Sequence, residues 1–343
     1  MTINFLVITD PHFAGVGPRA YLPNPAAYKH DQLNILAECA QIAKEYNCAA
    51  VLMPGDLTNS HIMSTAVLTE FVEALKKFPC PVLTVAGNHD SETTNPEDLK
   101  SAPYGLLRAA KVIHDVYEKP FRVGNIVVTG HPYTEETDIN IEQYCDPGVS
   151  TSMDDCTVHL VHGMILKEPP YWAKDKEERP MRFTTLEQLN NLPSGHLPQI
   201  IICGHNHDGI GAAWVKDSLV VNYGSIARLT RAVGEIKRVL NVGLVTVESS
   251  RSYWAKEIVL QSQRPGHECL SREELIRELE RQKTKDKMSE FLNLLGTKRE
   301  IRTRDAKAVV LEAVKELKLS PEIGERCIKR IESVAAKGEA SEK

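Results

Sequence analysis

Short runs of apolar and β-branched residues recur along the first two thirds of the chain and predict buried strands. They span Ile3 to Thr9, Ala49 to Met53, Val82 to Ala86, Ile126 to Thr129, Val158 to Val161 and Gln199 to Cys203. Segments with the apolar spacing of helices separate the first three runs, at about 31–46 and 64–78. The chain is therefore expected to open as β-α-β-α-β with parallel strands, which is α/β architecture.

Later apolar runs follow one another without helical segments between them and predict antiparallel strands, in a second sheet or an extension of the first. They span Ala212 to Lys216, Leu219 to Asn222, Val239 to Val247 and Tyr253 to Val259. Two polar or proline-containing stretches, Pro103 to Leu107 and Lys167 to Arg182, are expected to be loops that line a substrate groove.

From Ser271 the pattern changes to charged helical sequence. One apolar face is formed by Leu275, Ile276 and Leu279, another by Phe291, Leu292, Leu294 and Leu295, and a further helix is expected around 306–317. We therefore expect a main domain over residues 1–260 and a helical C-terminal appendage over 261–343, with a frayed end.

Composition supports an ordinary folded protein. Of the 343 residues 42% are hydrophobic and 25% charged, which are globular values. No apolar run approaches 18 residues, and the first residues lack the features of a signal peptide, so we expect a soluble, cytoplasmic protein without a membrane segment. The eight cysteines are scattered and form no C-x-x-C pair, which predicts neither a disulfide framework nor a zinc knuckle.

The net charge of −5 is unevenly distributed. Residues 261–343 hold 19 Lys and Arg against 16 Asp and Glu, which leaves −8 for residues 1–260. Basic residues concentrate between Arg281 and Lys307. This stretch is either a solvated helical face or a surface for a polyanion.

Candidate metal ligands directly follow five of the predicted strands. In order they are Asp10 and His12, then Asp56, then Asn88 with His89 and Asp90, then His162, and finally His205 and His207. Ligands gather outside the carboxyl ends of strands in open α/β sheets, so these side chains should converge. Carboxylate and amide oxygens with imidazoles suit Mn²⁺, Fe²⁺ or Zn²⁺. Each motif alone is a weak signal, but five at strand ends predict a metal site.

The motifs D-x-H, G-D, G-N-H-D, H and G-H-x-H stand in this order across residues 10–207, and this pattern resembles the calcineurin-like metallophosphoesterase superfamily. The resemblance implies a two-sheet sandwich flanked by helices. It implies two divalent ions, Mn²⁺ first with Fe²⁺, Zn²⁺ or Mg²⁺ as alternatives. Asp10, His12 and His207 would hold one ion, Asn88, His162 and His205 the other, and Asp56 would bridge them.

The resemblance also suggests catalytic roles for two residues of the third motif. His89 would lie over the substrate and stabilise the transition state or protonate the leaving oxygen. Asp90 would orient His89. The alternative for His89 is a structural role beside the metal ligands.

Within the superfamily the chain looks most like SbcD-type nucleases of double-strand-break repair, including their bacteriophage relatives. The similar segments are Val127 to Tyr133 (VVTGHPY), Val221 to Leu229 (VNYGSIARL) and the helical tail with Met288 to Phe291. This likeness implies a manganese-dependent DNA exonuclease or endonuclease of recombination and repair. It also implies a homodimer and an SbcC-type coiled-coil ATPase partner docked on the C-terminal helices.

Departures from that pattern keep other functions open. Leu57-Thr58-Asn59 is closer to generic phosphodiesterases, which favours a cyclic-nucleotide or other small-molecule substrate, whereas Gly163-Met164 after His162 argues against the cyclic-nucleotide enzymes. A protein phosphatase and a non-catalytic scaffold on the same fold are further alternatives. If the substrate is DNA, the expected phosphate contacts are Arg228, Arg231, Lys237 and Arg238, with the stretch Arg281 to Lys307 farther out.

Overall fold

A computed structural model describes most of the chain up to residue 270. The described residues are 2–18, 21–93, 95–149, 152, 154–169, 182–230 and 232–270, with helical positions at 276, 280, 310, 311, 314, 315, 324–326, 328 and 329. Contacts divide the chain into two units, Met1–Arg272 and Glu273–Lys343. The described part of the second unit is helical, and Val310 in it is buried. Of the predicted apolar face Leu275, Ile276 and Leu279, only Ile276 is described, and it is exposed; the face around Phe291 and the basic stretch from Arg281 lie outside the described residues.

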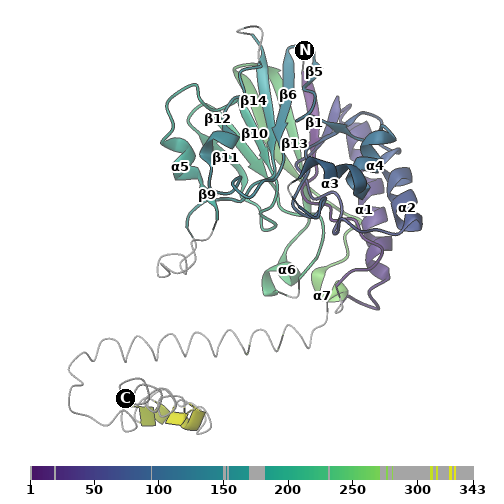
Figure 1. The fold of residues 1–343 in the computed structure, drawn as a ribbon, viewed down its shortest axis with the longest axis vertical. Helices are drawn as coiled ribbons and strands as arrows, with labels where there is room; N and C mark the ends of the chain where they lie inside the picture. The colour runs from purple at the N-terminus through teal and green to yellow at the C-terminus, as the bar shows by residue number, and fades with distance from the viewer. Residues whose placement is uncertain are drawn as a thin grey trace, which may run out of the picture. The chain divides into compact units, whose positions relative to one another are not determined.

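The first unit is built on two six-stranded sheets (Figure 1). The first sheet has the order β14-β13-β1-β2-β3-β4. Its strands are β1 (Ile3–Val7), β2 (Ala50–Met53), β3 (Val82–Thr84), β4 (His114–Asp115), β13 (Asn241–Ser249) and β14 (Ser252–Val259). Strands β1 to β4 are parallel, and β13 and β14 add antiparallel to the free side of β1.

The second sheet has the order β11-β12-β10-β7-β6-β5. Its strands are β5 (Phe121–Val123), β6 (Ile126–His131), β7 (Cys156–Val161), β10 (Ile200–Cys203), β11 (Gly211–Val215) and β12 (Ser218–Asn222). Parallel pairing joins β6, β7, β10 and β12, and antiparallel strands stand at both edges. A separate two-stranded pair is formed by β8 (Ile165–Leu166) and β9 (Thr184–Thr185).

The described helices are α1 (Ala27–Glu45), α2 (Thr65–Leu75), α3 (Pro96–Ser101), α4 (Pro103–Ala109), α5 (Leu186–Asn190), α6 (Val233–Lys237) and α7 (Gly266–Cys269), with a 3-10 helix η1 (Ile141–Tyr144). Apolar residues of α1, α2 and α4 pack on the outer face of the first sheet, and those of α5 pack on the outer face of the second. In α1, Ile35, Leu36 and Cys39 are buried on one face at helical spacing. Ser64 caps α2 by accepting a hydrogen bond from the backbone of Val67. The expected β-α-β-α-β opening and two-sheet α/β sandwich flanked by helices are confirmed.

The period of two along β1 explains why the two sheets pack together. Phe5 and Val7 belong to the apolar core between the sheets, whereas Leu6 and Ile8 pack in the core beneath α1 and α2. Both faces of this strand are therefore buried, which accounts for its continuous apolar run. A third core, which includes Tyr144 and Leu189, covers the outer face of the second sheet.

Two expectations about loops have different outcomes. Pro103 to Leu107, expected as a loop, belongs to helix α4, and Tyr104 and Leu107 are fully buried in it. A proline at the first position of a helix loses no hydrogen bond, so Pro103 starts the helix and does not interrupt it. The second expected loop, Lys167 to Arg182, falls mostly on residues 170–181, outside the described residues. Among the helices that are described, none has the length and apolarity to span a membrane.

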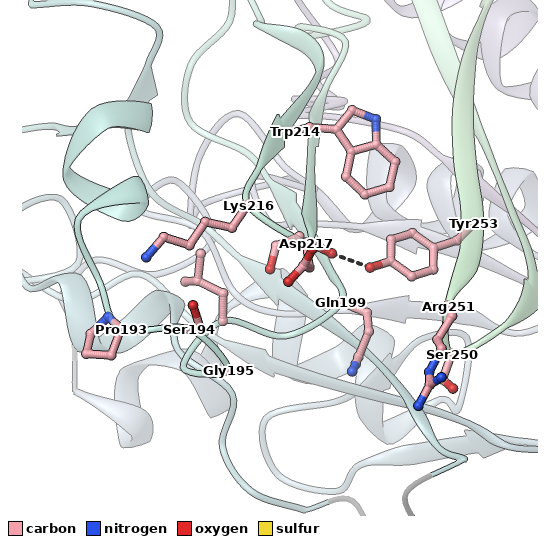
Figure 2. Close-up of a pocket in the computed structure, with 12 residues that line it drawn as sticks. Pro193, Ser194, Gly195, Gln199, Trp214, Lys216, Asp217, Ser250, Arg251 and Tyr253 are labelled. Atoms are coloured by element: carbon pink, nitrogen blue, oxygen red, sulfur yellow. Dashed lines mark hydrogen bonds between the residues drawn. The ribbon is translucent and has the colours of Figure 1, made fainter.

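A cavity of about 640 Å³ lies at the amino ends of β10 and β12, away from the carboxyl ends that carry the predicted ligands (Figure 2). Trp214 of β11 lies 5.5 Å from the ring of Tyr253 of β14, so this contact joins the edge strands of the two sheets. The hydroxyl of Tyr253 donates to the carbonyl of Asp217. None of the predicted metal ligands lines this cavity.

Candidate metal centre

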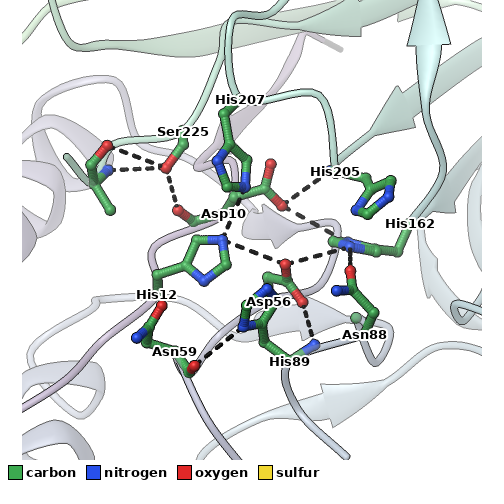
Figure 3. Close-up of polar contacts among 12 residues, drawn as sticks. Asp10, His12, Asp56, Asn59, Asn88, His89, His162, His205, His207 and Ser225 are labelled. Atoms are coloured by element: carbon green, nitrogen blue, oxygen red, sulfur yellow. Dashed lines mark hydrogen bonds and ion pairs between the residues drawn. The ribbon is translucent and has the colours of Figure 1, made fainter. Parts of the chain in front are cut away.

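All seven predicted metal ligands lie together where the carboxyl ends of both sheets meet (Figure 3). Strands β1, β2 and β3 of the first sheet lead to Asp10 with His12, to Asp56 and to Asn88. Strands β7 and β10 of the second sheet lead to His162 and to the pair His205 and His207. Both sheets are therefore needed to form the site, because each of them supplies only some of the ligands.

The backbone turns sharply at several of these residues. Asp10, His12, Asp56 and His205 have φ values of 44°, 43°, 49° and 72°, in the left-handed region that side chains other than glycine rarely adopt. Strain of this kind persists only where the surrounding structure enforces it, and it clusters at functional sites. The turns aim each ligand inward at the end of its strand.

Glycines allow the ligand loops to approach one another. Gly55 has φ 95°, and a Cβ atom there would collide with Nδ1 of His162. A Cβ atom at Gly87 would collide with Oδ1 of Asp56. Only glycine fits both positions, since any larger residue would push the carboxylate and the imidazole apart.

The ligands form two groups that share Asp56. His12, Asp56 and His207 make one group, and Asp56, His162 and His205 make the other; within each group the ligand atoms lie within 4.8 Å of one another. Oδ2 of Asp56 lies 3.3 Å from Nε2 of His12 and 3.5 Å from Nε2 of His162. One carboxylate oxygen therefore faces both groups, as a bridging ligand would.

The hydrogen bonds of His162 indicate which of its nitrogens is free to bind a cation. Its Nδ1 lies 2.7 Å from the carbonyl oxygen of Pro54, which can only accept, so Nδ1 carries the proton. Its Nε2 then carries no proton, and the lone pair of this nitrogen faces Oδ1 of Asn88 at 2.9 Å and the Asp56 carboxylate. A lone pair opposite two oxygens is unfavourable unless a cation lies between them.

Burial raises the pKa of the acidic residues in the centre. Burial and the neighbouring Asp56 raise the pKa of Asp10 well above its usual range. Burial raises the pKa of Asp56 to about 6, and burial with the charge of Asp56 raises the pKa of Asp90 to about 7. Each shift means that the ionised form is costly here without a positive charge to offset it.

The pKa values of three histidines of the centre shift in the opposite direction. Burial lowers the pKa of His207 to about 3, and burial together with neighbouring histidines holds the pKa of His12 and His162 well below the usual range. These imidazoles are neutral at pH 7, which is the form that binds metal.

The donor set fits divalent cations. Oδ2 of Asp10 and Oδ2 of Asp56 are buried and have no hydrogen-bond partner among the described residues. Orphaned buried carboxylate oxygens are rare in proteins unless an ion or water satisfies them. Hard oxygens beside neutral imidazoles, without a thiolate, suit a borderline or hard divalent metal.

The family model for calcineurin-like phosphoesterases matches residues 3–221, which include every ligand of the centre. The chain belongs to the calcineurin-like phosphoesterase family. Proteins of this family typically bind two divalent metal ions, in agreement with the two ligand groups. No curated protein matches the chain in sequence.

Three solved structures are similar to the chain at low sequence identity. A Thermus thermophilus protein, TT1561, is 13% identical with a TM-score of 0.43, and the match covers 75% of this chain and 99% of that one. A dimetal phosphatase from Danio rerio is 14% identical with a TM-score of 0.44, covering 76% and 99%. A purple acid phosphatase from yellow lupin, Lupinus luteus, is 12% identical with a TM-score of 0.44, and the match covers 77% of this chain but only 52% of the lupin protein.

In this phosphoesterase the ring of His89 is held at the edge of the centre. Its backbone N–H donates to Oδ1 of Asp56 at 2.8 Å, and its Nδ1 lies 3.0 Å from the carbonyl oxygen of Asn59. The ring meets that of His12 edge to face, with centroids 4.7 Å apart. Because the carbonyl fixes the proton on Nδ1, the opposite nitrogen is available to a substrate.

Asp90 has a different position from the one expected. The structure gives the His89 ring the carbonyl of Asn59 as its partner, whereas the Asp90 carboxylate accepts from the backbone N–H groups of Leu57, Thr58 and Gly87. Asp90 therefore ties the loop after β2 to the loop after β3. It holds the backbone around His89 and does not orient the ring itself.

Three side chains that support the centre were not among the predicted site residues. Oδ2 of Asp138 lies 3.5 Å from Nε2 of His205, where it can orient this ligand. Ser225 donates to the carbonyl of Asp10 at 2.7 Å. The ring of Tyr133 lies 5.5 Å from that of His205 and 6.0 Å from that of His162. Ser225 and Tyr133 stand inside nuclease-like segments, but Asp138 belongs to no motif.

The predicted phosphate contacts are largely engaged elsewhere. Arg228 is only 3% exposed, and its guanidinium donates to the carbonyls of Glu235 and Arg238. Arg238 in turn donates to the carbonyls of Ser225 and Ala227 and pairs with Glu235. These arginines brace the segment behind the centre, so neither is retained as a substrate contact. Arg231 lies outside the described residues.

Proposed function

We propose that this phosphoesterase hydrolyses phosphodiester bonds with two divalent ions, of which Mn²⁺ is the first choice. The observation that carries the proposal is the Asp56 carboxylate, whose Oδ2 faces a histidine of each ligand group at 3.3 and 3.5 Å. Two divalent ions held there would lower the pKa of a water and stabilise the charge that develops on the phosphate.

The protein residues would position the ligands and supply a proton. Pro54 fixes the tautomer of His162, and Asp138 faces His205, so the imidazoles are oriented before anything binds. His89, with Nδ1 held by Asn59, would stabilise the phosphate or protonate the leaving oxygen through its other nitrogen. Asp90 would keep the His89 loop at a fixed distance from Asp56.

We propose DNA as the substrate, with a role in recombination and repair. The support is the resemblance of Val127 to Tyr133 and of Val221 to Leu229 to SbcD-type nucleases. Both segments contribute to the centre, Tyr133 through its ring contacts and Ser225 through its hydrogen bond to Asp10. A homodimer and an SbcC-type coiled-coil ATPase partner stay predictions, since the helical segment that suggested the partner lies outside the described residues.

A small phosphodiester, such as a cyclic nucleotide, is the second candidate. It is favoured by the −8 net charge of residues 1–260 and by the burial of Arg228, which together leave little positive surface for a long polyanion. Asn59 in the position after Leu57 and Thr58 also suits this reading.

One experiment separates these candidates. An end-labelled linear duplex and a 2′,3′-cyclic nucleotide are incubated with Mn²⁺ and the full chain, with Asp56→Asn as the blank. Nucleotide release from the duplex that is absent in the variant supports the nuclease. Turnover of the cyclic nucleotide alone assigns the small-molecule activity, and no turnover of either, or of a bis-nitrophenyl phosphate ester, refutes the phosphodiesterase.

A further inference from the structure

A cavity of about 650 Å³ opens directly beside the metal centre. The ligand Asn88 and its neighbour Gly87 form part of its wall, and so does Tyr133, whose ring faces His162 and His205. Any group attached to a phosphate held by the second ligand group can extend into this space. Its volume lies within the range of about 300–1,000 Å³ that small-ligand sites occupy.

The wall offers aromatic surface at two places. Tyr117 is 57% exposed and lines the cavity, with its ring 5.7 Å from that of His131. Tyr133 lines the same cavity on the side of the metal ligands. Aromatic side chains that line such a space are a surface on which a nucleobase stacks, whatever its sequence.

Ser91 in the wall has a buried hydroxyl group. Ser91, three residues after Asn88, lines the cavity, but its Oγ is buried away from solvent and has no hydrogen-bond partner among the described residues. A hydroxyl both donates and accepts, so it suits a sugar hydroxyl or a base edge. Buried hydroxyls are normally satisfied, and a ligand in the cavity would satisfy this one once the side chain rotates toward it.

The charges of the wall argue against a second phosphate. Arg108 forms an ion pair with Glu118. Of the other charged residues of the wall, Lys100, which pairs with Glu97, and Arg182 stand against Glu92, Asp115 and Glu135, one net negative charge. A neutral nucleoside is accepted by such a wall, whereas a further phosphate would be repelled.

From these observations we propose that the cavity lined by Tyr117, Tyr133 and Ser91 binds the nucleoside that is attached to the phosphate at the metal centre. The inference deepens the proposed function, on which it rests, and applies equally to a DNA end and to a small nucleotide. The cavity then selects a nucleoside monophosphate group over a bare phosphate and over a polyphosphate.

Binding measurements on the Mn²⁺-loaded full chain test this without requiring turnover. Calorimetry compares thymidine 5′-monophosphate with inorganic phosphate and with 2-deoxyribose 5-phosphate, which lacks the base. Thymidine monophosphate should bind about tenfold more tightly than either, the size of one stacking contact. In Tyr117→Ala this ratio should fall toward one, and in Ser91→Ala it should fall severalfold.

Trp214→Ala is the matched control. Trp214 is 58% exposed, as Tyr117 is 57%, but it lines the cavity at the amino ends of β10 and β12. Its ratio should equal that of the wild type. Equal binding of all three probes overturns the inference, as does a ratio that Tyr117→Ala leaves unchanged. A Tyr117-dependent ratio in a protein that hydrolyses no ester supports the nucleoside site and refutes only the proposed catalysis.

Discussion

Nε2 of His12 and Nε2 of His207 lie 3.0 Å apart, with Oδ2 of Asp56 3.3 Å from the first of them. At most one of the two nitrogens can donate to the other, and burial keeps both rings neutral at pH 7. Two imidazoles and a carboxylate oxygen that converge in this way are suited to share a cation. His162 and His205 repeat the arrangement on the other side of Asp56.

Asp56→Asn should reduce hydrolysis by more than about 100-fold, because a neutral amide cannot bridge two cations as a carboxylate does. The measurement is turnover of a bis-nitrophenyl phosphate ester together with the metal content of the purified variant. Asp217→Asn, an exposed aspartate in the opposite cavity, serves as the control and should keep wild-type turnover. A fully active Asp56→Asn protein would rule out the bridging role.

His89→Ala should lower kcat by about 10²–10⁴-fold, the usual contribution of a positioned acid or base, while the metal content stays at the wild-type value. The reason is geometric: His89 touches Asp56 only through its backbone, and its ring is held by Asn59. Elemental analysis of the variant checks the metal content. Loss of metal would show that His89 belongs to the ligand set.

Asp138→Asn should weaken binding of the metal by about 10–100-fold, the range found when the carboxylate behind a ligating histidine is removed. The reason is its position 3.5 Å from Nε2 of His205. Titration with Mn²⁺, followed by recovery of activity from a metal-free preparation, gives the affinity. An unchanged titration midpoint would mean that the loop backbone alone orients His205.

The sequence predicted that these side chains converge because each follows an apolar strand, and the carboxyl ends of strands are where sites form in α/β folds. Asp10, Asp56 and Asn88 follow parallel neighbours in the first sheet, so their convergence needs only that pairing. That His162 and His205 come from a separate sheet is invisible in the apolar pattern. Only the two-sheet fold itself followed from the resemblance to the metallophosphoesterase superfamily.

The supporting contacts were harder to foresee. The carbonyl of Asn59 holds His89 through the backbone, which no side-chain pattern records. Arg228 illustrates the limit for charged residues, because an arginine in a loop looks the same in sequence whether it faces solvent or is buried against carbonyls. Burial depends on the packing of α6 and the strands around it, which is a tertiary property.

Arg228→Ala should destabilise the fold by roughly 1–3 kcal/mol, because it leaves the carbonyls of Glu235 and Arg238 without their donor. Denaturant unfolding of the metal-loaded protein measures this loss. The salt dependence of DNA binding should keep its slope, since no phosphate contact is removed. A shallower slope with unchanged stability would restore Arg228 as a phosphate contact.

Metal ions should stabilise the protein more at about pH 8 than at about pH 5.5. The folded-state pKa values of about 6 for Asp56 and about 7 for Asp90 exceed the usual pKa of an aspartate. The contribution of these two protonated carboxyl groups to the stability of the fold is therefore fully present at low pH. It is lost as the pH rises through those values, and the buried carboxylates then repel one another unless cations are bound. Melting temperatures with Mn²⁺ and with a chelator, at both pH values, give the metal-dependent gain.

Asp56→Asn provides the matched test of this pH dependence, because it removes one of the titrating groups and keeps the volume of the side chain. Its gain from Mn²⁺ should be smaller and should vary less between the two pH values. A wild-type gain that is the same at both would mean that the carboxylates ionise in the metal-free fold without cost, and that burial of the centre does not drive metal binding.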